Sequence, residues 1–492
     1  MTRVLQVSAE LYPLLKTGGL ADVAGALPAA LAAAGAEPRL LVPGFPAIRE
    51  ALGKECAVAP VALPWSEGRA ALLRGRLPGF EMPVYVLDAP GLFDRPGNPY
   101  ADAAGVAYAD NHRRFALLGL AASRLAEGVD GSWRPGIVHA HDWHAGLACA
   151  HVAASRSRRR TDARTVFTIH NLAYQGLFPA DLFCELGLPP HFYAVEGLEF
   201  YGQVSFMKAG LHFADAITTV SPSYAKEIQT PEQGCGLDGL LRHRAGVLHG
   251  ILNGVDYGVW SPASDASLAA AYDADQPDGK AACKAALQRE CGLDAKPDAP
   301  LFGIVSRLTE QKGLPLVLEA LDDLLDGGGQ LVVLGSGDAR LEAAFGEAAA
   351  RHPGRVARRT GMDEGLAHRI VAGSDVVLVP SRFEPCGLTQ LYGLSYGAQP
   401  LVHRVGGLAD TVVDCTLEDL AAGTATGFVF NAFTAEAYRR ALRRAFALWS
   451  RQEFWARVRA AAMRQHFSWD DAAARYMQVY RGVLAAPGDE PR

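Results

Sequence analysis

Short apolar runs alternate with longer stretches rich in alanine and leucine along most of this chain. In the first half, the apolar runs predict buried strands at Val4–Val7, Arg39–Val42, Val84–Leu87, Ile137–Ala140, Val166–Ile169, Ala216–Val220 and Val247–Leu252. A second series begins near residue 300 and predicts strands at Leu301–Val305, Leu331–Leu334, Arg355–Ala357, Val376–Val379, Gln399–Val402 and Gly427–Phe430. Strand, turn and helix repeated in this order predict an α/β fold with a parallel, doubly wound sheet in each half.

The two series are separated by Asp256–Pro300, which is rich in Ala, Asp and Pro and predicts a connection followed by a surface helix. A chain of 492 residues is also too long for one ordinary core. We therefore expect a first domain over residues 1–252, a second over 253–465, and a last helix with a tail over 466–492. Trp469, Tyr476 and Tyr480 share one face of that helix, a pattern typical of packing.

Composition excludes several classes of protein. Hydrophobic residues make up 49% and charged residues 20%, as in a globular protein, and the net charge of −6 argues against a general nucleic-acid binder. The basic run Arg156–Arg160 is interpreted as a solvated loop. The 8 cysteines lack zinc-ligand or redox spacing, and neither a signal peptide nor a bilayer-spanning run is visible, so we expect a cytoplasmic protein without a membrane partner.

Two glycine-bearing turns follow predicted strands and precede predicted helices. The first is Lys16–Val23, with Gly18 and Gly19, and the second is Glu384–Gln390. Backbone N–H groups at a helix start are unpaired and carry the positive end of the helix dipole, so they attract phosphate. The side chains of Lys16 and Glu384 are unusual for purely structural turns. Together these segments indicate a phosphate-bearing sugar donor.

Two cations follow another strand. Arg307 offers a planar fork and Lys312 a compact charge, and a turn into a helix allows both to face one diphosphate. Taken alone, the pair is weak evidence and two surface cations are the favoured interpretation, but its position at the carboxyl end of a sheet strand favours ligand binding. Neither Gly18-Gly19 nor the turn at Gly335–Asp338 completes a dinucleotide fingerprint, so no nicotinamide cofactor is indicated and we expect no cofactor.

The segment His139–His144 resembles a metal motif only superficially, because Trp143 stands where binuclear zinc hydrolases need Asp. We favour the polar wall of a ligand cleft, with buried core histidines as the alternative, and we expect no metal site. A carboxylate at Asp142 would accept hydroxyl protons, and the Trp143 indole would stack on a sugar ring. Glu384 either caps the following helix or accepts sugar hydroxyls, while the N–H groups of Gly387, Leu388 and Thr389 face phosphate.

With these segments assembled, the chain closely resembles bacterial and plant-plastid glycogen and starch synthases. The matching motifs are K-T-G-G-L-A-D-V at Lys16–Val23, H-A-H-D-W-H at His139–His144, T-I-H-N at Thr168–Asn171, N-G-V-D at Asn253–Asp256, S-R-L-T-x-Q-K-G at Ser306–Gly313 and P-S-R-F-E-P-C-G-L-T-Q at Pro380–Gln390. The resemblance implies a GT-B fold, in which two Rossmann-like domains face each other across a deep cleft and a helix near 466–485 crosses back to the first domain. It also implies transfer of glucose from ADP-glucose to the non-reducing end of an α-1,4-glucan such as glycogen, with retention at the anomeric carbon.

The resemblance also assigns roles to matching positions. The diphosphate would be held by Lys16, Gly18, Arg307, Lys312 and Thr389, and the transferred glucose by Glu384, His170 and Asn253. Glucose or the acceptor chain would face Asp22, Asp142, Trp143 and Asn171. Gly19, Cys386, Gly387 and Leu388 complete the expected substrate-binding set, and Arg307, Lys312, Glu384 and His170 are the expected catalytic residues.

One departure from related enzymes narrows the interpretation. Many retaining GT-B enzymes carry a second Glu eight positions after the first, and this chain has Tyr392 there, as the bacterial-type synthases do. No second carboxylate in these motifs clearly fits a two-carboxylate mechanism, and the resemblance implies front-side attack by the acceptor hydroxyl, without a metal. A glucan phosphorylase, which needs a lysine bound to pyridoxal phosphate, and an inactive glucan-binding scaffold are the alternatives.

Overall fold

The computed structural model describes residues 1–486, and the remaining residues of the expected tail lie outside that range. The chain divides into two compact units. The first contains Met1–Gly254 and also the last helix, α19 (Trp469–Ala485), and the second is Val255–Ser468. The chain passes from the first unit to the second after Gly254 and returns to the first after Ser468. The expected domain limits were residues 252 and 465.

The first unit is built around one large sheet. The strands of this unit are β1 (Thr2–Val7), β2 (Ala36–Pro43), β3 (Gly53–Ala62), β4 (Arg69–Arg76), β5 (Val84–Asp88), β6 (Ile137–His141), β7 (Arg164–Ile169), β8 (Leu177–Pro179), β9 (Glu199–Phe200), β10 (Gln203–Ser205), β11 (Ala216–Thr219) and β12 (Leu248–Gly250). Of these, β8, β10 and β9 form a separate small sheet. Its α-helices, besides α19, are α1 (Gly19–Ala33), α2 (Pro46–Ala51), α3 (Pro90–Phe93), α4 (Asn111–Ala126), α5 (Asp142–Ser157), α6 (Phe206–Phe213), α7 (Pro222–Glu227) and α8 (Asp238–His243).

In the described residues this sheet has nine strands in the order β12-β11-β7-β6-β1-β2-β5-β4-β3. All neighbours from β12 to β5 are parallel, whereas β4 pairs antiparallel with both β5 and β3. Every strand predicted in this half is present. Strands β3 and β4 and the short strands β8, β9 and β10 were not predicted; β3 forms the edge of the sheet and is mostly exposed.

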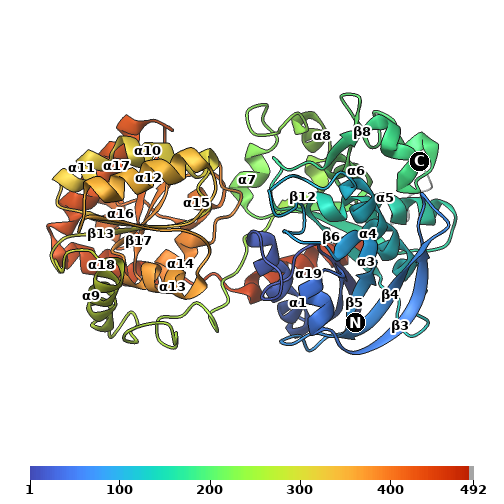
Figure 1. Cartoon of the computed structure of the whole chain (residues 1–492), viewed down its shortest axis with the longest axis horizontal. Helices are drawn as coiled ribbons and strands as arrows, with labels where there is room; N and C mark the ends of the chain where they lie inside the picture. Colours follow the sequence, from blue (N-terminus) through green and yellow to red (C-terminus); the bar gives the residue numbers. More distant parts are fainter. Residues whose placement is uncertain (487–492) are drawn as a thin grey trace. The chain divides into compact units, whose positions relative to one another are not determined.

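The second unit has a smaller sheet with helices on both faces (Figure 1). Its strands are β13 (Leu301–Val305), β14 (Gln330–Leu334), β15 (Val356–Arg359), β16 (Val376–Val379), β17 (Gln399–His403) and β18 (Phe428–Phe430). Its α-helices are α9 (Gly279–Cys291), α10 (Leu314–Glu319), α11 (Leu321–Asp326), α12 (Ala339–Arg351), α13 (Glu364–Gly373), α14 (Thr389–Ser395), α15 (Gly406–Thr411), α16 (Leu417–Ala422), α17 (Ala435–Trp449) and α18 (Gln452–Met463).

All six strands of this second sheet are parallel, in the order β15-β14-β13-β16-β17-β18. Consecutive side chains of a strand point to opposite faces. Accordingly, Leu331 and Val333 of β14 join one hydrophobic cluster with α10, α12 and α17, while Val332 and Leu334 join another with α9 and α13. Both faces of the sheet are therefore buried, as the continuous apolar strands predicted.

The last helix, α19, packs beside α1 in the first unit, where Figure 1 shows it in red next to the blue helix. The expected aromatic stripe is buried: Tyr476 and Tyr480 are 0% exposed and share a cluster with Leu27 and Leu31 of α1. The Tyr480 hydroxyl also reaches Gln6 at the centre of the sheet. The aromatic side chains of α19 thus pack as predicted, and the Tyr480 hydroxyl is a polar group among them that lies in the core.

None of the helices within residues 1–486 is long and apolar enough to cross a membrane.

Close helix packing in the first unit gives a stability prediction. A Cβ added at Gly146 of α5 would lie 2.1 Å from the carbonyl oxygen of Phe206 in α6. We expect Gly146→Ala to lower the free energy of unfolding by about 1–3 kcal/mol or more, because backbone must move to admit the methyl group. Gly482→Ala in α19 is the matched control, since nothing lies within 4 Å of its Cβ. Urea unfolding of both variants is the measurement, and equal midpoints would contradict the prediction.

Candidate active site

The strand order of each sheet reverses at one point, and the predicted site residues follow the strands on either side of it. In the first unit the reversal lies between β1 and β6, and in the second between β13 and β16. Open α/β sheets bind ligands at the carboxyl ends of such strands, because the chain connections leave there to opposite faces. Lys16 follows β1, Asp142 follows β6, Arg307 follows β13 and Glu384 follows β16.

Glu10 organises the loop that follows β1. Its carboxylate is 4% exposed and accepts hydrogen bonds from the N–H groups of Thr17 (2.7 Å) and Gly18 (3.1 Å), from the Thr17 hydroxyl and from the Tyr100 hydroxyl (2.5 Å). The expectation that the Gly18 N–H is unpaired was therefore wrong. Gly19 begins α1, so the helix still has its open amino end there. Glu10 was missed, although an acidic residue just after a buried strand was the available signal.

Lys16 and Asp22 lie close together in the same loop and helix. The Lys16 Nζ is 2.7 Å from Asp22 Oδ1, and the two side chains are 29% and 17% exposed. The pair holds the lysine at the amino end of α1 while leaving donors of the ammonium group for a ligand. The expected roles of these residues towards diphosphate and glucose stay predictions.

Asp142 is the most strained residue of the first unit's site. It has φ +61°, a left-handed conformation that is rare outside glycine, and it is 6% exposed. Burial raises its pKa to about 8, although the backbone N–H groups of Asn171, His170 and Trp143 act in the opposite direction. Its Oδ1 has no hydrogen-bond partner within residues 1–486. The structure thus joins Asp142, His170 and Asn171, and it leaves one buried oxygen available to a ligand.

A buried hydrogen-bond chain stands behind His170. Gln6 Nε2 donates to the Tyr480 hydroxyl (3.1 Å), Gln6 Oε1 faces His141 Nε2, and His141 Nδ1 lies 3.0 Å from His170 Nε2. Burial lowers the pKa of His170 to about 3 and that of His141 well below its usual value, so both rings are neutral at neutral pH. With the Gln6 oxygen accepting from His141, His170 Nε2–H donates to His141. The network therefore assigns a free lone pair to His170 Nδ1.

The other histidines of this segment are core residues. His139 and His141 are 0% exposed and His144 is 4% exposed, so the favoured interpretation of all three as a polar cleft wall was wrong. His139 Nδ1 lies 2.8 Å from the Tyr480 hydroxyl, and its Nε2 contacts Thr168. His139 and His141 lie in the central strand β6, and His144 lies in α5. A periodicity argument does not distinguish a central strand that is covered on both faces from one that faces a ligand.

Trp143 lines a cavity of about 440 Å³ together with Tyr174, Gly176, Phe200 and other residues. Gly176 has φ +59°, and a Cβ at this position would lie 2.2 Å from the indole, so glycine permits the close approach of this loop to the ring. Tyr174 is 48% exposed. Trp143 is half-buried among aromatic rings, with Phe115 edge-on at 5.0 Å. Stacking of its indole on a sugar stays a prediction.

In the second unit, Lys312 and Glu384 form a close ion pair. The Lys312 Nζ lies 2.7 Å from Glu384 Oε2, which also accepts a hydrogen bond from the Ser381 hydroxyl at 2.8 Å. The glutamate side chain is 8% exposed and the lysine side chain 20%. Helix α14 begins at Thr389 with Leu388 as its N-cap and without a side-chain cap, so the helix-cap alternative for Glu384 was wrong.

The segment after Glu384 is held by close backbone packing. Gly407 N donates to the carbonyl oxygens of Glu384 (3.1 Å) and Pro385 (3.2 Å), and a Cβ at Gly406 would lie 2.0 Å from the Glu384 oxygen. Gln390 Nε2 donates to the carbonyl oxygens of Cys386 and Gly387, which has φ +74°. Leu388 and Thr389 follow at the start of α14. This loop is therefore fixed by residues far away in the sequence.

Three further predicted positions complete the site description. Arg307 is exposed just after β13, and Asn253 is 6% exposed with its Oδ1 lacking a partner among the described residues. Tyr392, at the position of the second Glu in other retaining enzymes, stacks on Trp260 with ring centroids 3.7 Å apart. Tyr392 thus packs inside the second unit.

Metal ligands are not gathered in the part of the chain that the structure describes: no group of at least three His, Cys, Asp or Glu residues there could hold a metal ion.

Comparison with known proteins agrees with this arrangement. Residues 3–243 match the model of the starch synthase catalytic domain, and residues 292–461 match that of glycosyl transferases group 1. The catalytic domain of starch synthase IV from Arabidopsis thaliana, bound to ADP and acarbose, has a TM-score of 0.89 and 30% identity, covering 99% of this chain and 100% of that one. A sucrose-phosphate synthase from Thermosynechococcus elongatus shares the fold alone, with a TM-score of 0.59 and 17% identity over 99% of this chain and 100% of that one.

The fold and these matches define a GT-B glycosyltransferase with two Rossmann-like domains. Glycogen synthase of Variovorax paradoxus is 60% identical over 99% of this chain and 100% of its own length. Glycogen synthase of Francisella tularensis subsp. novicida is 57% identical over 98% and 99%. The chain belongs to the glycogen synthase family of retaining glucosyltransferases.

The raised pKa of Asp142 gives a prediction about stability and pH. Between the ordinary value of 3.8 and the folded value of about 8, the folded protein holds a proton that the unfolded chain has lost. Stability should therefore fall as pH rises through this window. Asp142→Asn removes the effect and suits the left-handed backbone. We expect the wild type to lose stability relative to this variant between pH 5 and pH 8 in urea unfolding.

The exposed Asp181 provides the control for this experiment, since Asp181→Asn removes one carboxylate that is already in contact with solvent. Its stability should follow the wild type across the same pH range. If the stability difference between wild type and Asp142→Asn does not change with pH, Asp142 is not protonated in the folded protein.

Proposed function

We propose that this chain transfers glucose from ADP-glucose to the non-reducing end of an α-1,4-glucan, with retention of configuration. The observation that carries the proposal is the Lys312–Glu384 pair at the strand-order reversal of the second sheet, because it combines a cation for phosphate with an acceptor for sugar hydroxyls. The starch synthase relative, whose structure carries ADP and acarbose, supports a nucleotide diphosphate and an oligosaccharide as ligands.

The second unit would hold the leaving group. Lys312 uses one of its three donors on Glu384 and has the others for phosphate oxygens, and Arg307 adds a planar fork. Negative charge grows on the diphosphate as the glycosidic C–O bond breaks, and cations fixed beforehand stabilise that charge more than they stabilise the bound donor. The second oxygen of Glu384 is the proposed acceptor for glucose hydroxyls.

The first unit would hold sugar. Asp142 Oδ1 is proposed to hydrogen-bond a hydroxyl of the transferred glucose, and the lone pair on His170 Nδ1 is proposed to accept from another, with Asn171 beside them. The cavity beside Trp143 and Tyr174 has the aromatic lining that a glucan acceptor needs. Lys16, Gly19 and Asp22 would act at the amino end of α1.

In the proposed reaction, the acceptor 4-hydroxyl attacks the anomeric carbon from the side on which the diphosphate leaves. The new C–O bond forms as the bond to the phosphate oxygen breaks, and the hydroxyl proton passes to that oxygen. This step needs no second carboxylate as nucleophile. The cytoplasmic location and the expectation of no nucleic acid, metal, cofactor or membrane partner remain predictions from the sequence.

The alternative of a glucan phosphorylase is set aside by the family to which the chain belongs. An inactive glucan-binding scaffold is the remaining alternative, and it predicts glucan binding without any transfer of glucose.

The cations of the second unit provide a test of the mechanism. Arg307→Ala and Lys312→Ala should each lower kcat by roughly 10²-fold or more, since their contribution grows as the diphosphate leaves. Arg340→Ala is the control, because this arginine has an 87% exposed side chain in the same unit. Steady-state kinetics with varied donor separates the effects, and a change in KM alone would mean that the cations stabilise bound donor and transition state equally.

The donor is tested by direct comparison. With glycogen as acceptor, we expect faster turnover of ADP-glucose than of UDP-glucose at equal concentration, as the bacterial-type motifs indicate. Release of the nucleoside diphosphate and incorporation of labelled glucose are measured together, with glycogen omitted as the control. Faster turnover of UDP-glucose would overturn the choice of donor, and binding without transfer of either sugar would favour the scaffold.

A further inference from the structure

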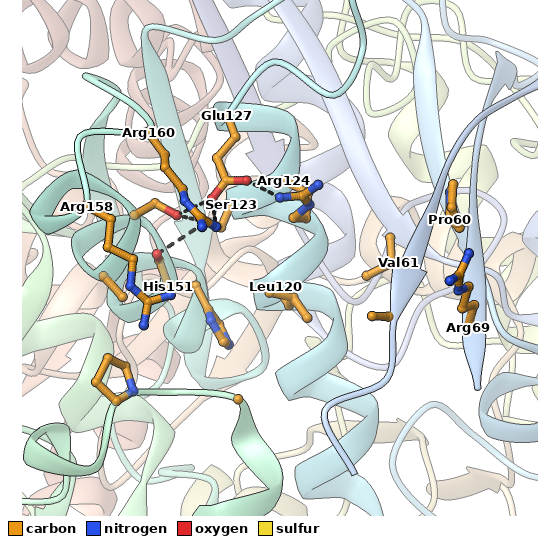
Figure 2. A pocket seen from close by; sticks show the side chains of 15 residues that line it. Pro60, Val61, Arg69, Leu120, Ser123, Arg124, Glu127, His151, Arg158 and Arg160 are labelled. Carbon is orange, nitrogen blue, oxygen red and sulfur yellow. Dashed lines mark hydrogen bonds and ion pairs between the residues drawn. The ribbon is translucent and has the colours of Figure 1, made fainter. Parts of the chain in front are cut away.

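A second cavity in the first unit lies away from the candidate active site. Its volume is about 320 Å³, at the lower end of the roughly 300–1,000 Å³ typical of small-molecule sites. It is lined by strands β3 and β4, the carboxyl-terminal halves of α4 and α5, and the loop at residues 187–189 (Figure 2). Asp142 begins α5 and Arg158 follows its end, so about 24 Å of helix separates the two regions.

The cavity is strongly positive. Arg69, Arg124, Arg158 and Arg160 line it, against a single carboxylate, Glu127. Glu127 forms an ion pair with Arg124 and lies 4.0 Å from Arg160. Arg69 and Arg158 form no ion pair with any other residue of 1–486. Four guanidinium groups around one cavity repel each other, and an anionic ligand would relieve that repulsion.

The dipole of α5 does not account for this cluster. Cations are favourable at the carboxyl end of a helix, which explains arginines near residue 157. However, Arg69 comes from β4 and Arg124 from α4. Arg156, from the same basic run, pairs instead with Asp215 at 2.7 Å. The run interpreted from the sequence as a solvated loop is thus divided between a structural ion pair and the cavity lining.

His151 adds a buried acceptor to the lining. His151 is 4% exposed, and its Nε2 has no hydrogen-bond partner among the described residues. Burial lowers its pKa to about 4, while a hydrogen bond to the Leu186 backbone uses the other ring nitrogen. The ring is therefore neutral and its Nε2 carries a lone pair. This nitrogen accepts a hydrogen bond from a hydroxyl and cannot donate one to phosphate. Glu127 Oε1, which accepts from the Ser155 hydroxyl at 2.6 Å, is a second acceptor.

We propose that this cavity binds a sugar phosphate, with the phosphate on the exposed arginines and sugar hydroxyls on His151 and Glu127. An inorganic anion would satisfy only the arginines, and an uncharged glucan only the acceptors. A small molecule with hydroxyl groups at one end and a phosphate monoester at the other satisfies both. The site is independent of the reaction proposed above.

Calorimetric titration of the full chain tests this proposal with glucose 1-phosphate as the probe, beside inorganic phosphate and glucose. The double variant Arg307→Ala/Lys312→Ala serves as the background, so that the candidate active site does not contribute. We expect glucose 1-phosphate to bind at least about tenfold more tightly than either inorganic phosphate or glucose. Adding Arg158→Ala and Arg160→Ala should weaken it at least about tenfold.

Arg159→Asn is the matched control. It removes a charge from the same run at a residue outside the cavity lining, and asparagine suits its φ of +56°. Binding should be unchanged in this variant. Because the altered arginines are exposed, these variants should fold. The proposal is overturned by absence of binding, by equal affinity for inorganic phosphate, or by affinity that survives the Arg158 and Arg160 changes.

Discussion

The reversal of strand order in each parallel sheet is the constraint on which the rest of this structure depends. At β1 and β6, and again at β13 and β16, the chain leaves neighbouring strands towards opposite faces of the sheet. The carboxyl ends of these strands are the places where loops can present polar groups beside a fully buried sheet. Asp142 and Glu384 follow two of these strands directly or within a few residues, and each is 6% exposed. Placing the chemistry there means burying charge.

The buried carboxyl groups differ in the hydrogen-bond and ion-pair partners that offset the cost of their burial. Glu10 accepts from four donors and shapes the loop before α1. Glu384 has a lysine and a serine hydroxyl as partners. Asp142 has backbone donors and one unpaired oxygen, and burial raises its pKa despite those donors. Groups that are fixed before the ligand arrives need no reorganisation during the reaction, which is how such sites gain catalytic strength.

The sequence predicted the parallel strands well, because strands buried on both faces appear as apolar runs. It did not predict β3, which is an exposed edge strand, or β4, which pairs with it. Lys312 and Glu384 were identified as site residues because each is a charged residue that follows a predicted strand. Their ion pair, however, depends on the pairing of β13 with β16, which the sequence does not show. His139 contacts Tyr480 across 341 positions of the sequence, and Gln6 contacts Tyr480 across 474. Local periodicity carries no information about such contacts.

The last helix shows how far the site extends from its motifs. Tyr480 lies on α19, and its hydroxyl accepts a hydrogen bond from the amide of Gln6 in β1. The oxygen of that amide faces His141 and so sets its tautomer and the atom that His170 presents. Since neutral histidines offer one donor and one acceptor each, reversing the Gln6 amide would reverse every later donor in the chain. The aromatic stripe near the end of the sequence therefore has two functions. It buries apolar surface against α1, and it orients a histidine that is positioned by β7, on the other side of β6 from β1.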